Sequence, residues 1–283
     1  MPSTYAHYLF GKEMLACCPA AVAAAASARR ELYDIGLHGP DLLFYYKPLG
    51  NNAVNRIGFG MHGEPARNFF GPARDAVRGS EDVPAARAYV FGFLCHFALD
   101  AACHSYIENK IRLSGVTHTE IESEFDRYLL QKEGRKPLSA RLTQHIRPTA
   151  ENARVIAPFF QIREKQAEKA LRSMVFYNNL LRAPHAPKRA LVNAVLKLSG
   201  NYKEMHGMMM AKRPVPACAD SNLRLEKLMN KAKPRAAALM EEYIAYLEGS
   251  GELSAAFGAT FGHAHGWRSI PVLSLQEEQD YEV

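Results

Sequence analysis

Paired cysteines, a P-loop and long apolar runs are all missing from this chain. Its 283 residues contain no CxxC pair, P-loop or internal repeat. The five cysteines are odd in number and irregularly spaced, so neither a disulfide scaffold nor a thiolate zinc knot is indicated. No stretch approaches the roughly 18 uninterrupted apolar residues that a transmembrane helix needs. We expect reduced, buried thiols at Cys17, Cys18, Cys95, Cys103 and Cys218.

The chain also lacks a large excess of either charge. It has 35 basic and 29 acidic residues, a formal net charge of +6, spread along the sequence without a compact basic stripe. This balance allows attraction to a phosphate-bearing substrate or an anionic surface, but stable nucleic-acid binding is not indicated. Hydrophobic residues make up 48% of the chain, enough to build a sizeable core.

Residues 15–28 are apolar and rich in alanine, and in this respect they imitate a secretory signal. The segment before them lacks a basic region, because Lys12 is followed directly by Glu13, and Pro19 interrupts the apolar run. We therefore expect an uncleaved, cytoplasmic protein.

Helical periodicity without strand-like alternation predicts an all-α fold, with a single domain over residues 1–283. A segment rich in glycine, proline and asparagine, residues 47–82, is expected to be irregular with short helical pieces. Pro234 is expected to kink or divide the last long helix, and the tail from residue 249 is expected to be partly mobile. Helices are predicted over 4–34, 84–113, 118–132, 137–146, 150–183, 187–198 and 222–248.

Potential metal ligands recur at helical spacing near the middle of the chain. His96, Asp100 and His104 stand four residues apart, so they share one helix face over about 12 Å. That span suits two neighbouring ions with Asp100 between them, and a further pair, His118 and Glu122, would complete the outer site from the next helix. A single buried histidine is usually a core residue, but five ligand-type residues in apolar surroundings favour a metal centre.

The chemistry of these side chains narrows the kind of centre. Imidazoles and carboxylates without clustered thiolates are typical of a catalytic zinc-type site. The other acids at the start of the helix over 118–132, including Glu124 and Asp126, are expected to form a solvated face that complements the helix dipole.

Three further ligand-type residues precede this region. His7 lies in the first predicted helix, Asp41 follows Gly39 and Pro40 at a loop-to-helix junction, and His62 lies in the glycine-rich segment GFGMHGEP. An aspartate in such a place is commonly a helix N-cap, so Asp41 alone would carry no functional meaning.

Taken in order, His7, GPD, His62, HxxxDxxxH and HxxxE resemble the zinc-dependent phospholipase C family, which is related to the S1/P1 single-strand nucleases. The resemblance covers roughly residues 3–130 and implies a multi-helix domain of the phospholipase C/P1 nuclease type, with two to three Zn²⁺ ions. It implies one zinc at Asp41, His62, His96 and Asp100, and a second at His104, His118 and Glu122. A third would be bound by His7, Asp100 and the amine and carbonyl of the first residue.

The chain departs from the family at two places. It begins MPSTYAH, whereas secreted members are processed to expose an N-terminal tryptophan. After the motif aspartate it has Leu42, where the best-known members have a tyrosine that contacts the head group. Phe59, three residues before His62, is kept as a candidate substrate contact, since aromatic faces hold choline by cation–π contact.

These features predict hydrolysis of a phosphodiester by a metal-activated water, most simply phospholipase C-like cleavage of a phospholipid or related phosphoester with transient contact to a membrane surface. Asp41 is the candidate catalytic base. The residues leave open an S1/P1-like nuclease, a small-molecule phosphatase or phosphodiesterase, and a metal-stabilised protein without catalysis.

Overall fold

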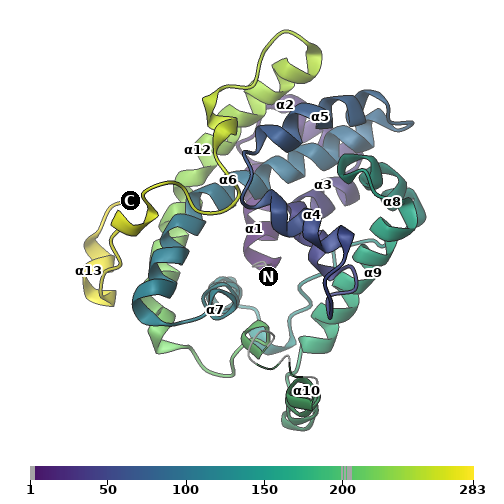
Figure 1. The fold of residues 1–283 in the computed structure, drawn as a ribbon. Coiled ribbons are helices and arrows are strands. Elements are labelled where there is room, and N and C mark those ends of the chain that lie inside the picture. Colours follow the sequence, from purple (N-terminus) through teal and green to yellow (C-terminus); the bar gives the residue numbers. More distant parts are fainter. Residues whose placement is uncertain (1–3, 199, 201, 203–205) are drawn as a thin grey trace.

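The computed structural model describes residues 4–198, 200, 202 and 206–283. Helices dominate these residues and no strand occurs among them, so the predicted all-α class is confirmed (Figure 1). The α-helices are α1 (Thr4–Met14), α2 (Ala20–Ala28), α3 (Arg30–Gly36), α4 (Ala53–Met61), α5 (Arg67–Arg78), α6 (Val83–Ser114), α7 (His118–Lys132), α8 (Ala150–Ile156), α9 (Glu164–Leu181), α10 (Ala186–Leu198), α12 (Ala219–Glu248) and α13 (Leu275–Asp280).

The long helix α6 runs through the centre of the molecule (Figure 1). It begins where the Asp82 side chain accepts a hydrogen bond from the Ala85 amide, and it ends at Gly115 in the left-handed region, with φ of 70°. By length and composition α6 could cross a membrane, but 89% of its apolar 18-residue stretch is buried inside the protein. Its apolar character is therefore accounted for by packing on all sides.

Two glycines allow α3 and α6 to cross closely. A Cβ atom at Gly92 would lie 2.1 Å from the Tyr33 carbonyl oxygen, and one at Gly36 would lie 2.2 Å from the Tyr89 carbonyl oxygen. Because both obstructing atoms belong to helix backbone, they cannot rotate out of the way. The contact fixes the position of the chain that leads from α3 into the functional site.

We expect Gly92→Ala to destabilise the fold by about 3 kcal/mol, because overpacking a tight core forces backbone shifts. Urea denaturation monitored by circular dichroism measures this loss. Gly71→Ala is the matched control: its Cβ would have no neighbour closer than 4.0 Å, and alanine favours the helix. Equal stability of the two variants would contradict the tight crossing.

The predicted helix over residues 4–34 is wrong as a single element, because the chain forms α1, α2 and α3 there. Pro19 stands at the N-cap of α2, where its fixed φ and missing amide hydrogen suit a helix start. Asp126 on α7 accepts hydrogen bonds from the Tyr5 and Ala6 amides at 2.9 and 2.8 Å. Asp126 is therefore a buried cap of α1 and not part of a solvated face, and Glu124 is likewise buried against Arg127.

Other boundaries also differ from the predictions. Residues 47–82 contain the regular helices α4 and α5, since Asn52 forms a capping box that starts α4. The predicted helix over 137–146 is reduced to a 3-10 turn at Pro137–Ser139. Helix α12 continues past Pro234 without division.

The C-terminal tail is packed against the body of the protein. Phe257 and Phe261 are buried in the main core, and the Ala66 amide donates to the Ala259 carbonyl at 2.8 Å. Aromatic burial therefore anchors this part of the tail to the central helix.

Candidate metal centre

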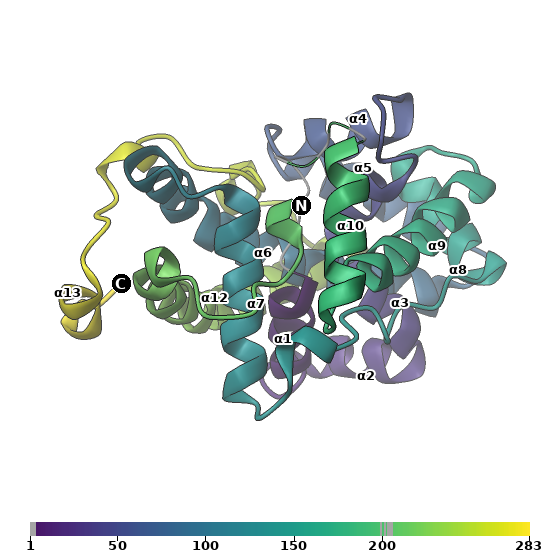
Figure 2. The same ribbon diagram turned by 90° about the horizontal axis from the view of Figure 1, so that it is seen from below.

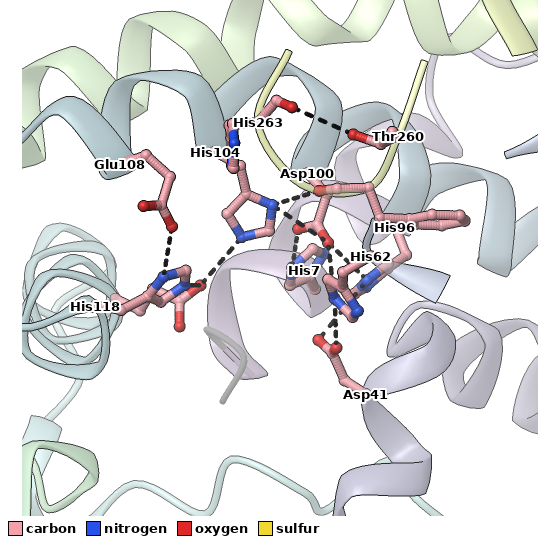
Figure 3. Close-up of polar contacts among 12 residues, drawn as sticks. His7, Asp41, His62, His96, Asp100, His104, Glu108, His118, Thr260 and His263 are labelled. Carbon is pink, nitrogen blue, oxygen red and sulfur yellow. Dashed lines mark hydrogen bonds and ion pairs between the residues drawn. The ribbon is translucent and has the colours of Figure 1, made fainter. Parts of the chain in front are cut away.

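The functional residues converge on one face of α6 (Figure 3). His96, Asp100 and His104 lie along that face, and their spacing of four residues stacks them one turn apart. Helix α1 supplies His7, and helix α7 supplies His118 and Glu122. The remaining two residues are Asp41, in a 3-10 helix over Gly39–Tyr45, and His62, at the C-cap of α4.

Asp100 stands at the centre of the cluster. Its Oδ1 atom lies 3.2 Å from His7 Nε2, and its Oδ2 atom lies 2.9 Å from His96 Nε2. The same Oδ2 atom is 3.8 Å from His62 Nε2 and 3.8 Å from His104 Nδ1. One carboxylate thus faces four imidazoles, as a residue placed between metal ions would.

Asp41 completes the side of the cluster formed by the chain between α3 and α4. Its Oδ1 atom lies 3.1 Å from His62 Nε2, and its Oδ2 atom lies 3.7 Å from His96 Nε2. Its backbone amide donates to the His38 carbonyl. The carboxylate is therefore directed into the cluster and is not a helix cap.

The outer part of the cluster joins α6 to α7. His118 Nε2 lies 3.1 Å from Glu122 Oε1, and His104 Nε2 lies 3.9 Å from the same oxygen. His118 Nδ1 faces Glu108 Oε1 at 3.9 Å. Glu108 was not predicted, although it continues the series of residues four apart on α6.

All eight predicted ligands lie in this one cluster. Within each of three groups, the potential ligand atoms lie within 4.8 Å of one another: His7, His96 and Asp100; Asp41, His62 and His96; and His104, His118 and Glu122. The third group has the composition that the resemblance implies for one zinc. His96 belongs to both of the other groups, which the resemblance did not imply. The first-residue ligand lies outside the described residues.

Several buried polar atoms in the cluster lack a hydrogen-bond partner, as expected where a cation binds. His96 Nε2, Asp41 Oδ1, Asp100 Oδ2 and Glu122 Oε2 are buried and make no hydrogen bond of standard geometry. His96 Nε2 and Asp100 Oδ2 are only 2.9 Å apart, yet they meet without hydrogen-bond alignment. Buried polar atoms without partners are costly. The potential ligand atoms are nitrogen and oxygen, so this cluster could hold metal ions.

Backbone carbonyls orient three of the histidines. The Nδ1 atoms face the carbonyl oxygens of Gly58 for His62, at 2.9 Å, and of Leu37 for His96, at 3.2 Å. His104 Nδ1 donates to the Phe261 carbonyl. These contacts leave each Nε2 as the free ligand nitrogen, which is the usual arrangement around a bound metal.

Gly39 explains why the chain can pass so close to His96. Its φ is 48°, and a Cβ atom there would lie 2.3 Å from His96 Cδ2. Only glycine fits both the backbone conformation and the space. The glycine of the GPD sequence thus positions Asp41 beside His96.

The charges of the cluster perturb its titration. Burial alone would lower the pKa of His62, but the Asp41 carboxylate outweighs it and raises this pKa to about 9. Burial is likewise outweighed at His118, where Glu122 and Glu108 raise the pKa to about 10. The pKa values of the three carboxyls are lowered by neighbouring histidines although burial opposes this: Asp41, Asp100 and Glu122. The carboxylates therefore stay charged, as cation binding requires.

Aromatic rings border the cluster on the α4 side. Phe59 is 57% exposed and stacks on Phe44, with ring centroids 4.3 Å apart. Phe44 in turn lies 5.3 Å from the His62 ring. Leu42, at the position of the family's tyrosine, is buried in the core and offers no surface to a ligand. Phe44 was missed because it belongs to an apolar run that is typical of core residues.

A pocket opens beside the Glu122 end of the cluster. Its empty space is about 690 Å³, part of it open to solvent. Its lining combines apolar side chains with two basic ones, and includes Glu122, Tyr45, Leu181, Arg182, Arg189 and Met210. Neither arginine was predicted from the sequence, because neither belongs to a motif.

No protein-family model, curated protein or solved structure matches this chain.

A second histidine pair lies next to the cluster. His38 Nε2 and His145 Nε2 are 2.8 Å apart, and the His145 ring stacks on Tyr8. Burial lowers the pKa of His145 to about 3, with a contribution from the charge of Arg30. Burial and His145 lower the pKa of His38 well below 6.5. Both imidazoles are therefore neutral in the folded protein near neutral pH.

This pair makes stability depend on pH. Because the folded-state pKa values lie below the unfolded value near 6.5, the unfolded chain binds more protons as pH falls below 6.5. We expect the free energy of unfolding to fall by about 1–2 kcal/mol per histidine between about pH 7 and about pH 5. Urea denaturation of the metal-free protein at both pH values measures the change, and His145→Gln should show a smaller one. Identical pH dependence in the variant would contradict this origin.

Proposed function

We propose that this protein is a zinc-dependent hydrolase of phosphodiester bonds, acting on a phospholipid or a related phosphoester. The observation that carries the proposal is that eight side chains with nitrogen or oxygen ligand atoms meet in one cluster. Several of these ligand atoms are buried and lack a hydrogen bond. Three such groups in contact suit a cluster of ions better than a single structural ion. The resemblance to zinc-dependent phospholipases C points to the same chemistry.

The ligand sets follow from the geometry and the motifs together. Asp41, His62 and His96 would hold one ion with Asp100 beside them, and His104, His118 and Glu122 would hold a second. His7 and Asp100 would contribute to a third. Zinc, when bound, acts as a Lewis acid toward phosphate oxygens and lowers the pKa of water to about 7.

Asp41 is the residue best placed to move a proton. Its carboxylate is buried, its Oδ1 atom lacks a standard hydrogen bond, and neighbouring histidines keep its pKa low. It would orient the attacking water and accept its proton at Oδ1. The phenyl rings of Phe44 and Phe59 would shield the same side from solvent.

The pocket beside Glu122 would receive the substrate. Leucine and methionine side chains in its wall suit an apolar group, while Arg182 and Arg189 offer donors to ester or phosphate oxygens. A phospholipid combines both kinds of group in one molecule. This composition favours a lipid over a small polar ester.

Elemental analysis of the purified protein tests the metal content. We expect two or three zinc ions per chain, and a content of zero would refute the proposal. A panel of substrates then tests the reaction: a short-chain phospholipid, bis(4-nitrophenyl) phosphate and single-stranded DNA. The phospholipid should yield diacylglycerol and a phosphorylated head group, whereas preferential cleavage of the DNA would show a nuclease instead.

A further inference from the structure

Helix α10 has two apolar faces, and only one of them is packed. The buried face joins a small satellite cluster that is separate from the main core. Its members are Leu181, Ala183, Val192, Leu196 and Met209. Helix α10 is therefore attached to the body through few contacts and lies at its periphery (Figures 1 and 2).

The opposite face of α10 exposes large apolar side chains. Leu191 is 65% exposed, Val195 54% and Leu198 89%. With Ala194 these residues fall at i, i+3, i+4 and i+7, the spacing of a helix face that normally packs on a core. The preceding helix α9 adds exposed apolar side chains at Phe176 and Leu180. Half of the ten exposed large apolar residues in the described part of the chain thus lie between residues 176 and 198, so they are not scattered at random.

The same part of the chain carries the protein's excess positive charge. Residues 182–218 include seven basic residues and one acidic residue, a formal charge of +6, which equals the net charge of the whole chain. The expectation of evenly spread charge is therefore wrong. On α10 itself there is no acidic residue, and Lys197 stands at the margin of the exposed apolar face.

Helix α10 lies next to the candidate substrate pocket. Leu181, Arg189 and Met210 line that pocket, and Arg189 of α10 donates to the Met210 carbonyl at 2.6 Å. Lys188 donates to the Asn179 and Arg182 carbonyls, which fixes the start of α10 against the end of α9. A surface bound by α10 would therefore be held near the pocket mouth.

We propose that α10 binds the surface of a bilayer that contains anionic lipids. Leu191, Val195 and Leu198 would enter the boundary between head groups and acyl chains, and exposed basic residues such as Lys197 beside them would face lipid phosphates. The positive charge favours an anionic bilayer over a second copy of the chain as the binding partner. A symmetric dimer through this face would bring two segments of charge +6 together. The lipid nature of the substrate rests on the proposed function, but binding to the bilayer does not.

Vesicle sedimentation with zinc-loaded protein tests the proposal. The probes are vesicles of phosphatidylcholine alone and of phosphatidylcholine with about 30% phosphatidylglycerol. We expect binding to the anionic vesicles to be at least about tenfold stronger than to the neutral ones, and to weaken as salt rises from about 0.1 M to about 1 M.

A triple variant identifies the face: Leu191→Ser, Val195→Ser and Leu198→Ser. It should bind the anionic vesicles at least about tenfold more weakly, since most of the inserted apolar area is gone. The control is Leu49→Ser with Leu113→Ser, two exposed leucines outside residues 176–198, and it should bind like the wild type. Unchanged binding of the triple variant, or no wild-type binding to anionic vesicles, would overturn the proposal. So would size-exclusion chromatography with light scattering that shows a dimer which the triple variant disrupts.

Hydrolysis measured in parallel separates this inference from the proposed function. The triple variant should hydrolyse bis(4-nitrophenyl) phosphate at the wild-type rate, because the substitutions lie outside the metal cluster, and lose rate only on vesicle lipids. A protein that binds anionic vesicles but hydrolyses no phosphodiester would refute the proposed function and leave the membrane surface in place.

Discussion

Asp100→Asn is expected to lower phosphodiester hydrolysis roughly a thousandfold, because metal ions supply several kcal/mol of transition-state stabilisation and each 1.36 kcal/mol is a factor of ten. The substitution keeps the volume of the side chain but removes the charge that faces four histidines. An amide is a poor ligand between two cations. We therefore also expect the zinc content to fall by at least one ion per chain.

Measurements of kcat/KM and of zinc content on the same preparation check this result. Asp75→Asn is the matched control, because Asp75 is an exposed aspartate on α5, away from the cluster. Its zinc content and rate should equal those of the wild type. Full metal content with full activity in Asp100→Asn would show that Asp100 does not bridge the ions.

Asp41→Asn is expected to reduce kcat by about 10²–10⁴-fold, the usual contribution of a general base. Asp41 lies within 4 Å of two histidines of the cluster, whereas Asp100 faces four. Most of the zinc should therefore stay bound, held by His62 and His96 and by the other residues of the cluster. A loss of kcat with retained metal distinguishes a proton acceptor from a ligand needed for metal binding.

The pH dependence of kcat provides a second readout for Asp41. Because neighbouring histidines hold the pKa of Asp41 below its usual value near 3.8, its titration would contribute only at the most acidic end of the wild-type profile, and that contribution should be absent from the residual activity of Asp41→Asn. An unchanged kcat would refute the role as base. A parallel loss of zinc and activity would instead assign Asp41 to metal binding alone.

Repeated spacing made much of the site predictable from the sequence. His96, Asp100 and His104 lie on a helix whose bounds match the prediction to within one residue, because a buried helix leaves a clear periodic pattern. His118 and Glu122 follow the same rule on α7. These residues are local in sequence, so the geometry of one helix fixes their relation.

Other partners in the site depend on contacts that no local pattern encodes. Phe261 meets His104 across 157 positions of sequence, and its contribution is a backbone carbonyl, which every residue type possesses. His38 and His145 are 107 positions apart and match no motif. Tertiary packing alone brings such groups together. The prediction of one helix over residues 4–34 fails at the break between α1 and α2 for another reason: the alanine-rich run that follows Pro19 has high helix propensity.

The main-chain carbonyls that orient His62, His96 and His104 have an evolutionary consequence. A side-chain partner can be deleted by one nucleotide change, whereas a carbonyl persists under any substitution that preserves the backbone path. Leu37 and Phe261 could therefore drift among apolar residues of similar size while the histidines keep their tautomers. Mutational tolerance at these two positions, scored by retained zinc in a saturation library, should accordingly exceed the tolerance at the eight clustered side chains.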